Sequence, residues 1–286
     1  MNHGSSIHVI AAIEGLEIIE TRGLRHAFGR HRHDRYVIGL TTHGVQQFNY
    51  RGAARTCDRG QAFILHPDEP HDGRPGTGDG YGYRAAYIAP ELVRQALGAG
   101  DAPFVAQPVC TRPALIAALG ELLTVNADDA ALALASGIQR LADALAESSD
   151  GPRRRVPRSD QGLARRIGDD LAAHWRSGIS ITVLESRHRI SRFAMTRLFR
   201  RHYGVSPQRF LIMRRLDHAR RMIERGSPLA DAALASGFAD QSHMSRQFMQ
   251  AFGISPGRWR RLYTNSIPPS SSTDCPVMPL ASGEAR

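Results

Sequence analysis

The C-terminal half of the chain contains one motif twice. The first copy, residues 195–210, is MTRLFRRHYGVSPQRF, and the second copy, residues 244–259, is MSRQFMQAFGISPGRW. Matching positions lie 49 residues apart, so that Gly204 corresponds to Gly253 and Pro207 to Pro256. A repeat of this period indicates two copies of one supersecondary unit.

Each copy has the pattern of a helix-turn-helix. In the second copy, Ser227 is a suitable N-cap, Pro228 suits the first helical position, and Gly237 suits the end of that helix. Asp240 then opens the next helix, in which Met244 and Phe248 are predicted to face inward.

The first copy has the same pattern with two departures. Its first helix is predicted to start at Ile181, and its recognition helix at Ser191, with Met195 and Phe199 facing inward. Glu185 and Arg189 stand where the second copy has a small alanine and a glycine. These two residues predict a looser or slightly re-angled first unit.

One long helix is expected to join the two units, from Pro207 to about Arg225. About 19 residues at ~1.5 Å per residue span ~28 Å. With the width of the flanking units, this length places the two recognition helices roughly one DNA turn, ~34 Å, apart. One chain is therefore predicted to enter two successive major grooves on one face of a duplex.

These residues resemble a known family. The run GFADQSHMSRQF at 237–248, followed by AFGISPGRW at 251–259, is similar to the second helix-turn-helix of the AraC/XylS family of bacterial transcription regulators, and the resemblance covers about 180–263. It implies double-stranded DNA and a small-molecule effector of unknown identity as partners, a homodimer, and RNA polymerase as a further possible partner.

The charge is distributed unevenly. Residues 153–263 contain 23 arginines and 8 acidic residues, a net charge of +15, whereas the whole chain carries +10. The remaining residues are therefore net acidic. Such an asymmetry indicates a nucleic-acid-binding half and a second half with another role.

Cysteine usage and hydropathy place the protein in a reducing, aqueous compartment. The three cysteines are far apart and form no CxxC motif, so no disulfide framework is expected. The N-terminus lacks a signal-peptide pattern, and no apolar run reaches the ~18 residues of a membrane span. A cytoplasmic protein without a membrane anchor is expected.

The N-terminal half has short apolar runs broken by turn residues. Strands are predicted at 36–40, 45–50, 61–65 and 83–88, with turns at Gly52, Gly60, 68–70 and 73–82. This texture predicts a small antiparallel barrel or jelly roll. The pattern G60-x5-HP-x-x-PH resembles the cupin-like effector-binding domain of AraC-type regulators.

Histidines are the candidate effector-binding residues of this half, and they are His31, His33, His66 and His71. A metal site is the second interpretation, because cupin enzymes hold an ion with an HxH pair and a distant histidine. The carboxylate expected a few residues after the pair is missing, and Asp34 is predicted to face away, so no metal and no cofactor are assigned. The third interpretation is ordinary turn and surface histidines, since the chain has 13.

After Pro90 the spacing of the apolar residues becomes helical. Helices are expected at 92–97, from Pro113 onward, and at 128–147. The last two have apolar stripes that either cover the barrel or pack on a second subunit. The predicted division is a cupin-like effector-binding and dimerisation domain at 1–147, a linker at 148–159, a DNA-binding domain at 160–263 and a disordered tail at 264–286.

The outward faces of the two recognition helices supply the candidate DNA contacts. They are Arg192, Phe193, Thr196, Arg197 and Arg200 in the first helix, and Gln241, Ser242, His243, Ser245 and Arg246 in the second. Arginine can pair with guanine, glutamine with adenine, and an aromatic ring or threonine methyl with thymine. Each of them has a plainer alternative, a solvated helix face, and the arginines can also hold phosphate.

The sequence therefore predicts an α+β two-domain protein with an N-terminal antiparallel β-barrel and a C-terminal all-α double helix-turn-helix. The predicted function is that of a sequence-specific transcription regulator without enzymatic activity. One alternative is a metal-dependent cupin enzyme with a DNA-binding appendage. The other is a non-specific architectural DNA-binding protein, which would bind by charge alone.

Overall fold

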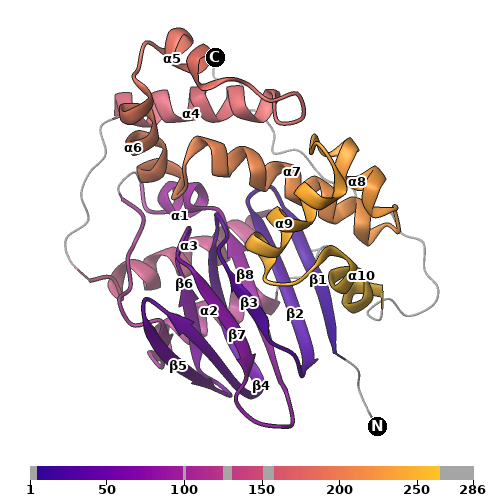
Figure 1. Ribbon diagram of the computed structural model, residues 1–286. Coiled ribbons are helices and arrows are strands. Elements are labelled where there is room, and N and C mark those ends of the chain that lie inside the picture. The colour runs from indigo at the N-terminus through magenta and orange to yellow at the C-terminus, as the bar shows by residue number, and fades with distance from the viewer. Residues whose placement is uncertain (1–4, 99–100, 125–130, 151–157, 265–286) are drawn as a thin grey trace.

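The computed structural model describes residues 5–98, 101–124, 131–150 and 158–264 (Figure 1). The strands are β1 (Ser6–Ile13), β2 (Leu16–Leu24), β3 (Phe28–His31), β4 (Tyr36–Tyr50), β5 (Ala53–Asp58), β6 (Ala62–Leu65), β7 (His71–Pro75), β8 (Tyr81–Ile88) and β9 (Val109–Cys110). The helices are α1 (Pro90–Ala96), α2 (Pro113–Thr124), α3 (Ala131–Glu147), α4 (Arg158–Ala173), α5 (Ile181–His188), α6 (Arg192–Tyr203), α7 (Pro207–Glu224), α8 (Leu229–Ala235), α9 (Gln241–Phe252) and α10 (Pro256–Thr264). The predicted fold class, an antiparallel β domain followed by helices and an all-α helix-turn-helix domain, is confirmed.

Strand β4 belongs to both faces of the β domain. Its first half pairs with β8 and β6, and its second half pairs with β5 and β7, all antiparallel. The strand passes from one face to the other at Gly44, where φ is +64° and an added Cβ would collide with the carbonyl of Gly80. The prediction of two strands, at 36–40 and 45–50, is therefore wrong, because a glycine bends one strand without ending it. The predicted turn at 73–82 is also too long, since β7 extends to Pro75.

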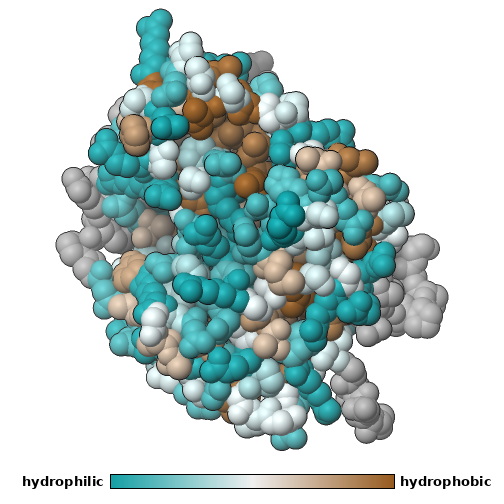
Figure 2. Space-filling model, in the orientation of Figure 1, coloured by the Kyte–Doolittle hydropathy of each residue, from teal (hydrophilic) through white to brown (hydrophobic). Residues whose placement is uncertain are grey.

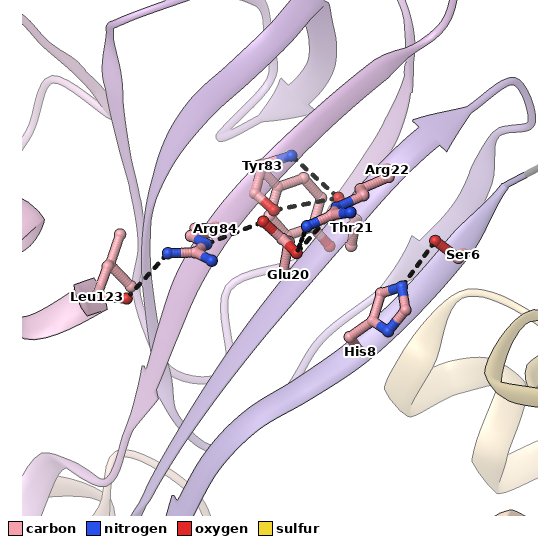
Figure 3. Close-up of polar contacts among 8 residues, drawn as sticks. All are labelled: Ser6, His8, Glu20, Thr21, Arg22, Tyr83, Arg84 and Leu123. Atoms are coloured by element: carbon pink, nitrogen blue, oxygen red, sulfur yellow. Dashed lines mark hydrogen bonds and ion pairs between the residues drawn. The ribbon is translucent and has the colours of Figure 1, made fainter. Parts of the chain in front are cut away.

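Polar contacts fix the sheet and its first covering helix (Figure 3). Glu20 on β2 accepts from Arg22 and from Arg84 on β8, each at 2.9 Å. The Thr21 hydroxyl accepts from the backbone N–H of Tyr83 at 3.0 Å. Arg84 also donates to the carbonyl of Leu123 near the end of α2, at 3.5 Å. These contacts hold β2 against β8 and attach the end of α2 to the same pair of strands.

Helices α2 and α3 lie against one face of the sheet (Figure 1). Their inward leucines Leu115, Leu119, Leu141 and Leu145 are at most 1% exposed and share a core with the strands. Of the two predicted roles for these apolar stripes, covering the sheet is the one observed within a single chain. No helix in the described ranges is long and apolar enough to cross a membrane.

The two helix-turn-helix units have different cores. The first unit, formed by α4, α5, α6 and the start of α7, has its own cluster that contains Leu184, Met195 and Phe199. The second unit, formed by the rest of α7 with α8, α9 and α10, shares one continuous cluster with the interior of the barrel, through residues such as Met213 and Phe248. The second unit is therefore packed on the N-terminal domain, and the long helix α7 joins it to the first.

Ser191 and Asp240, where the two recognition helices were predicted to start, are their N-cap residues. Ser191 accepts from the N–H of Ala194 at 3.4 Å, and Asp240 accepts from the N–H of His243 at 2.7 Å. Helix α8 starts one residue later than predicted, with Pro228 and not Ser227 at its N-cap. The predicted joining helix is observed as α7.

The two departures in the first copy have local roles. Arg189 adopts the left-handed conformation that Gly237 has in the second copy, with φ of +50° against +74°. Glu185 extends its carboxylate to the start of α6, where it accepts from the N–H of Arg192 at 2.6 Å. A residue that the sequence marks as a misfit thus satisfies one of the free N–H groups at a helix start.

Candidate nucleic-acid interface and effector cavity

The predicted DNA contacts lie on the outer sides of α6 and α9. All ten are exposed or half-buried, whereas Met195, Phe199, Met244 and Phe248 on the inner sides are fully buried. Phe193 is 74% exposed in the first turn of α6, and Figure 2 shows hydrophobic atoms gathered in the region of α4 to α6. A large ring held in water at a helix start is available for contact with an apolar group such as the thymine methyl.

Both recognition helices contact the N-terminal domain by their C-terminal ends. Arg201 at the end of α6 forms an ion pair with Asp101 at 2.8 Å, and its carbonyl accepts from Arg94 at 3.1 Å. At the end of α9, the carbonyl of Gly253 accepts from Gly29 N–H at 2.8 Å. The first turns stay open, and these are the turns with which a recognition helix contacts base edges.

Three of the four predicted effector-binding histidines come together. His31 on β3 is the cross-strand partner of His71 on β7, and their ring centroids are 4.3 Å apart. His33 follows β3, and its ring centroid is 4.7 Å from that of His71. His66 is elsewhere: its Nδ1 bonds to the Tyr50 hydroxyl at 2.8 Å, and its Nε2 accepts from Val105 N–H at 3.1 Å.

The histidine cluster is electrically neutral at physiological pH. Burial, followed by the neighbouring histidine, lowers the pKa of His31, His33 and His71 to about 3. Burial also raises the pKa of Asp34, which lines the same cavity as the histidines. The prediction that Asp34 faces away is wrong, because residues 32–35 do not form a strand and the alternation of a strand does not apply to them.

The cluster lines a cavity of about 70 Å³ between the two domains. One wall is the barrel, with Phe28, Tyr81, Tyr83 and Tyr87 beside the histidines. The other wall is the second helix-turn-helix unit, and it consists of Met213, Asp217, Arg220, Ala251, Phe252 and Trp259. A molecule bound in this cavity would contact both domains at once.

A chain of buried charges crosses the domain boundary beside the cavity. Arg220 on α7 donates to Glu17 on β2 at 2.6 Å and to Glu224 at 2.9 Å. Arg35 donates to Asp217 on α7 at 3.1 Å. Burial opposes the ionisation of Asp217, but Arg35 and Arg220 outweigh it and hold the pKa of Asp217 below its usual range.

The sequence prediction missed this charged cluster. The signal was the placement of Asp217 and Arg220 next to Leu216 and Ala219 on the apolar stripe of α7, where a solvated charge has no place. Their partners Glu17 and Arg35 are about 180 to 200 positions away in the chain, and no local pattern connects them.

Comparisons with known proteins identify both halves. The family described as AraC-like ligand binding domain matches residues 15–153, and a helix-turn-helix domain family matches residues 184–262. The uncharacterized HTH-type transcriptional regulator YbfI of Bacillus subtilis is 25% identical over 242 residues, which cover 80% of this chain and 86% of that protein. The HTH-type transcriptional activator RhaS of Yersinia pestis is 26% identical over 253 residues, which cover 83% and 91%.

Solved structures show the same two-domain fold. ToxT from Vibrio cholerae superposes with a TM-score of 0.63 at 12% identity and covers 88% of this chain and 99% of its own. A second ToxT structure, described as bound to an unsaturated fatty acid, superposes with a TM-score of 0.60 at 13% identity and covers 92% and 97%. At this identity the likeness concerns the fold.

Proposed function

This chain belongs to the AraC family of transcription regulators, and from that premise we propose that it recognises one DNA operator with two recognition helices under the control of a bound small molecule. One observation carries the proposal: α6 and α9 both begin with a capped, solvent-open turn and end against the effector-binding domain. In this proposal the N-terminal end of each recognition helix contacts DNA, and its C-terminal end contacts the effector-binding domain.

We assign base contacts to the open turns. In α6 they are Arg192, Phe193, Thr196 and Arg197, and in α9 they are Gln241, Ser242, His243, Ser245 and Arg246. A correct contact discriminates against a wrong base by ~1–3 kcal/mol. Arg200 lies farthest from the open turn of α6, beside Arg201 and a second hollow that Arg51 and Phe104 also line. A phosphate contact suits its position better than a base contact.

The effector enters the cavity between the domains in this proposal. Its volume of about 70 Å³ is small against the roughly 300–1,000 Å³ of ordinary small-molecule pockets. A larger effector must therefore widen the cavity by moving the docked helix-turn-helix unit. Differential affinity for the docked and the moved arrangement then shifts their populations. The fatty acid in a ToxT structure supports a small-molecule site in this fold.

Further proposals follow from the family. We propose domains at 1–147 and 160–263 joined by a linker at 148–159; residues 151–157 and 265–286 lie outside the described residues. A homodimer would use the outward sides of α2 and α3, since their apolar sides are buried. We also propose a cytoplasmic location, contact with RNA polymerase, and binding without catalysis.

The test starts with selection of genomic fragments that the purified full-length chain retains. On the selected operator, Arg197→Ala and Gln241→Ala should each weaken specific binding about tenfold or more while non-specific binding changes little, because each removes a base contact. Arg22→Ala, on the barrel, removes the same charge as Arg197→Ala and serves as the control. Equal losses of specific and non-specific affinity would overturn the assigned base contacts.

A further inference from the structure

The three clustered histidines are oriented alike. The Nδ1 atom of His31 lies 2.8 Å from the carbonyl of Gly29, and that of His33 lies 2.8 Å from the carbonyl of Arg35. The Nδ1 atom of His71 lies 2.9 Å from the carbonyl of Glu69. A carbonyl oxygen only accepts hydrogen bonds, so each Nδ1 carries the proton. The lone pair of each neutral ring is therefore on Nε2.

This arrangement is the one that orients histidine ligands in metal proteins, where the second ring nitrogen donates to a carbonyl and fixes the tautomer. One ring nitrogen from each of the three residues lies within 4.8 Å of the other two. In the described part of the chain, the hydrogen bonds of these three rings are the ones made by Nδ1. The Nε2 lone pairs are therefore available to a cation bound by all three.

We propose that His31, His33 and His71 bind one divalent transition-metal ion at the boundary between the barrel and the second helix-turn-helix unit. Imidazole ligands suit Zn²⁺, Ni²⁺, Co²⁺ or Cu²⁺, whereas Ca²⁺ and Mg²⁺ take oxygen ligands. Three protein ligands leave further coordination positions for water or for an oxygen or nitrogen donor of a small molecule.

The cavity beside the histidines suits the remaining positions of the ion. Gln46 Oε1 and the Tyr81 hydroxyl are buried, line this cavity and have no hydrogen-bond partner among the described residues. A metal-bound water donates two protons, and Gln46 Oε1 can accept one of them. The cavity also has room for several waters or a small ligand on the ion.

The site is joined mechanically to the second recognition helix. Gly29 and Arg32, which flank His31, donate backbone hydrogen bonds to Gly253 and Gln250 at the end of α9, at 2.8 and 3.0 Å. Tetrahedral Zn–N bonds of ~2.0–2.1 Å require nitrogens about 3.3 Å apart, so the ion has to draw the rings together. Movement of His31 then moves the segment that holds α9. Resting on the proposed function, this coupling makes the ion a regulator of operator binding.

The first experiment measures metal binding alone. The full-length chain is stripped with a chelator and titrated with Zn²⁺ and, separately, with Co²⁺, whose visible absorption reports ligand number and geometry. The proposal expects one ion per chain, and His33→Gln and His71→Gln should each weaken binding by about 100-fold or more while circular dichroism shows the fold retained. His43→Gln, which removes an exposed histidine of β4, is the control. No stoichiometric binding, or full binding by His71→Gln, would overturn the site.

The second experiment measures operator affinity with and without the ion. The coupling predicts a change of about fivefold or more in the wild type, the lower range of allosteric effects, and none in His71→Gln. One bound ion with unchanged operator affinity overturns the coupling and leaves the site standing. A metal-binding chain that selects no operator at all instead refutes the proposed function, so the two failures are distinguishable.

Discussion

Replacement of Arg220 by methionine tests whether the buried charges hold the two domains together. The Arg220 side chain is 5% exposed, and its partners Glu17 and Glu224 are 10% and 9% exposed. Arg220→Met keeps the apolar stem but leaves two buried carboxylates without their shared cation. Breaking a buried ion pair from one side costs about 3–5 kcal/mol.

The control is an exposed ion pair of nearly the same length. Arg22 lies 2.7 Å from Glu20, but the Arg22 side chain is 65% exposed, so Arg22→Met should cost only about 0–1 kcal/mol. Urea unfolding followed by tryptophan fluorescence measures the loss of stability in both variants. Trp259 donates to Glu224 at 3.0 Å, so its fluorescence reports on the surroundings of Arg220. With a slope of ~3 kcal/mol per molar urea, Arg220→Met should lower the midpoint by about 1 M or more. Equal midpoints for the two variants would refute the role of burial in this cluster.

Three further variants test local features. Gly253→Ala should weaken the contact of α9 with the barrel, because φ at Gly253 is +72° and the new Cβ would lie 2.7 Å from Gly29 O and His31 Nδ1. The control is Gly226→Ala, which has a φ of +89° but no atom within 4 Å of the new Cβ and so introduces backbone strain alone. Gly253→Ala should be the more sensitive of the two variants to protease. Glu185→Ala should lower the free energy of unfolding by about 1 kcal/mol through loss of the cap on Arg192, and Glu185→Gln should restore part of it in thermal melts. Burial raises the pKa of Glu91 from 4.5 to about 7, so between these pH values the folded state binds a proton that the unfolded state has lost. The free energy of unfolding should therefore fall as pH rises from 4.5 to 7. Glu91→Gln should reduce this pH dependence in thermal melts between about pH 5 and 8.

The sequence predicted the helical half better than the β half. Caps, glycines and a period of 3.6 are local signals, and they placed the starts of α6, α7 and α9 to within about a residue. Strand β4 was divided in prediction because Gly44 gives the same local signal whether it ends a strand or bends it. Strands β1 to β3 and β5 were not predicted individually. The partner of β3 is β7, about 40 residues away, so no local signal marks it. Strands β1 and β5 form hairpins with their chain neighbours β2 and β4, and the prediction missed these local pairings.

The candidate sites divide in the same way. The exposed faces of the recognition helices followed from their buried residues, and the histidines were named from the HxH pattern and from the His-Pro turn. Pairing decided which of them meet: β3 lies beside β7 and brings His71 to His31, whereas His66 turns toward Tyr50. The contact between the domains had no sequence signal beyond the two charges on the apolar stripe of α7.

Hydroxyl-radical footprinting on the selected operator tests the central claim, that one chain recognises DNA with two helices. On a fragment that binds a single chain, the account predicts two protected stretches about 10 base pairs apart on one face of the duplex. Gln241→Ala should remove protection from one stretch and Arg197→Ala from the other. A single protected stretch, or two stretches on opposite faces, would contradict the account.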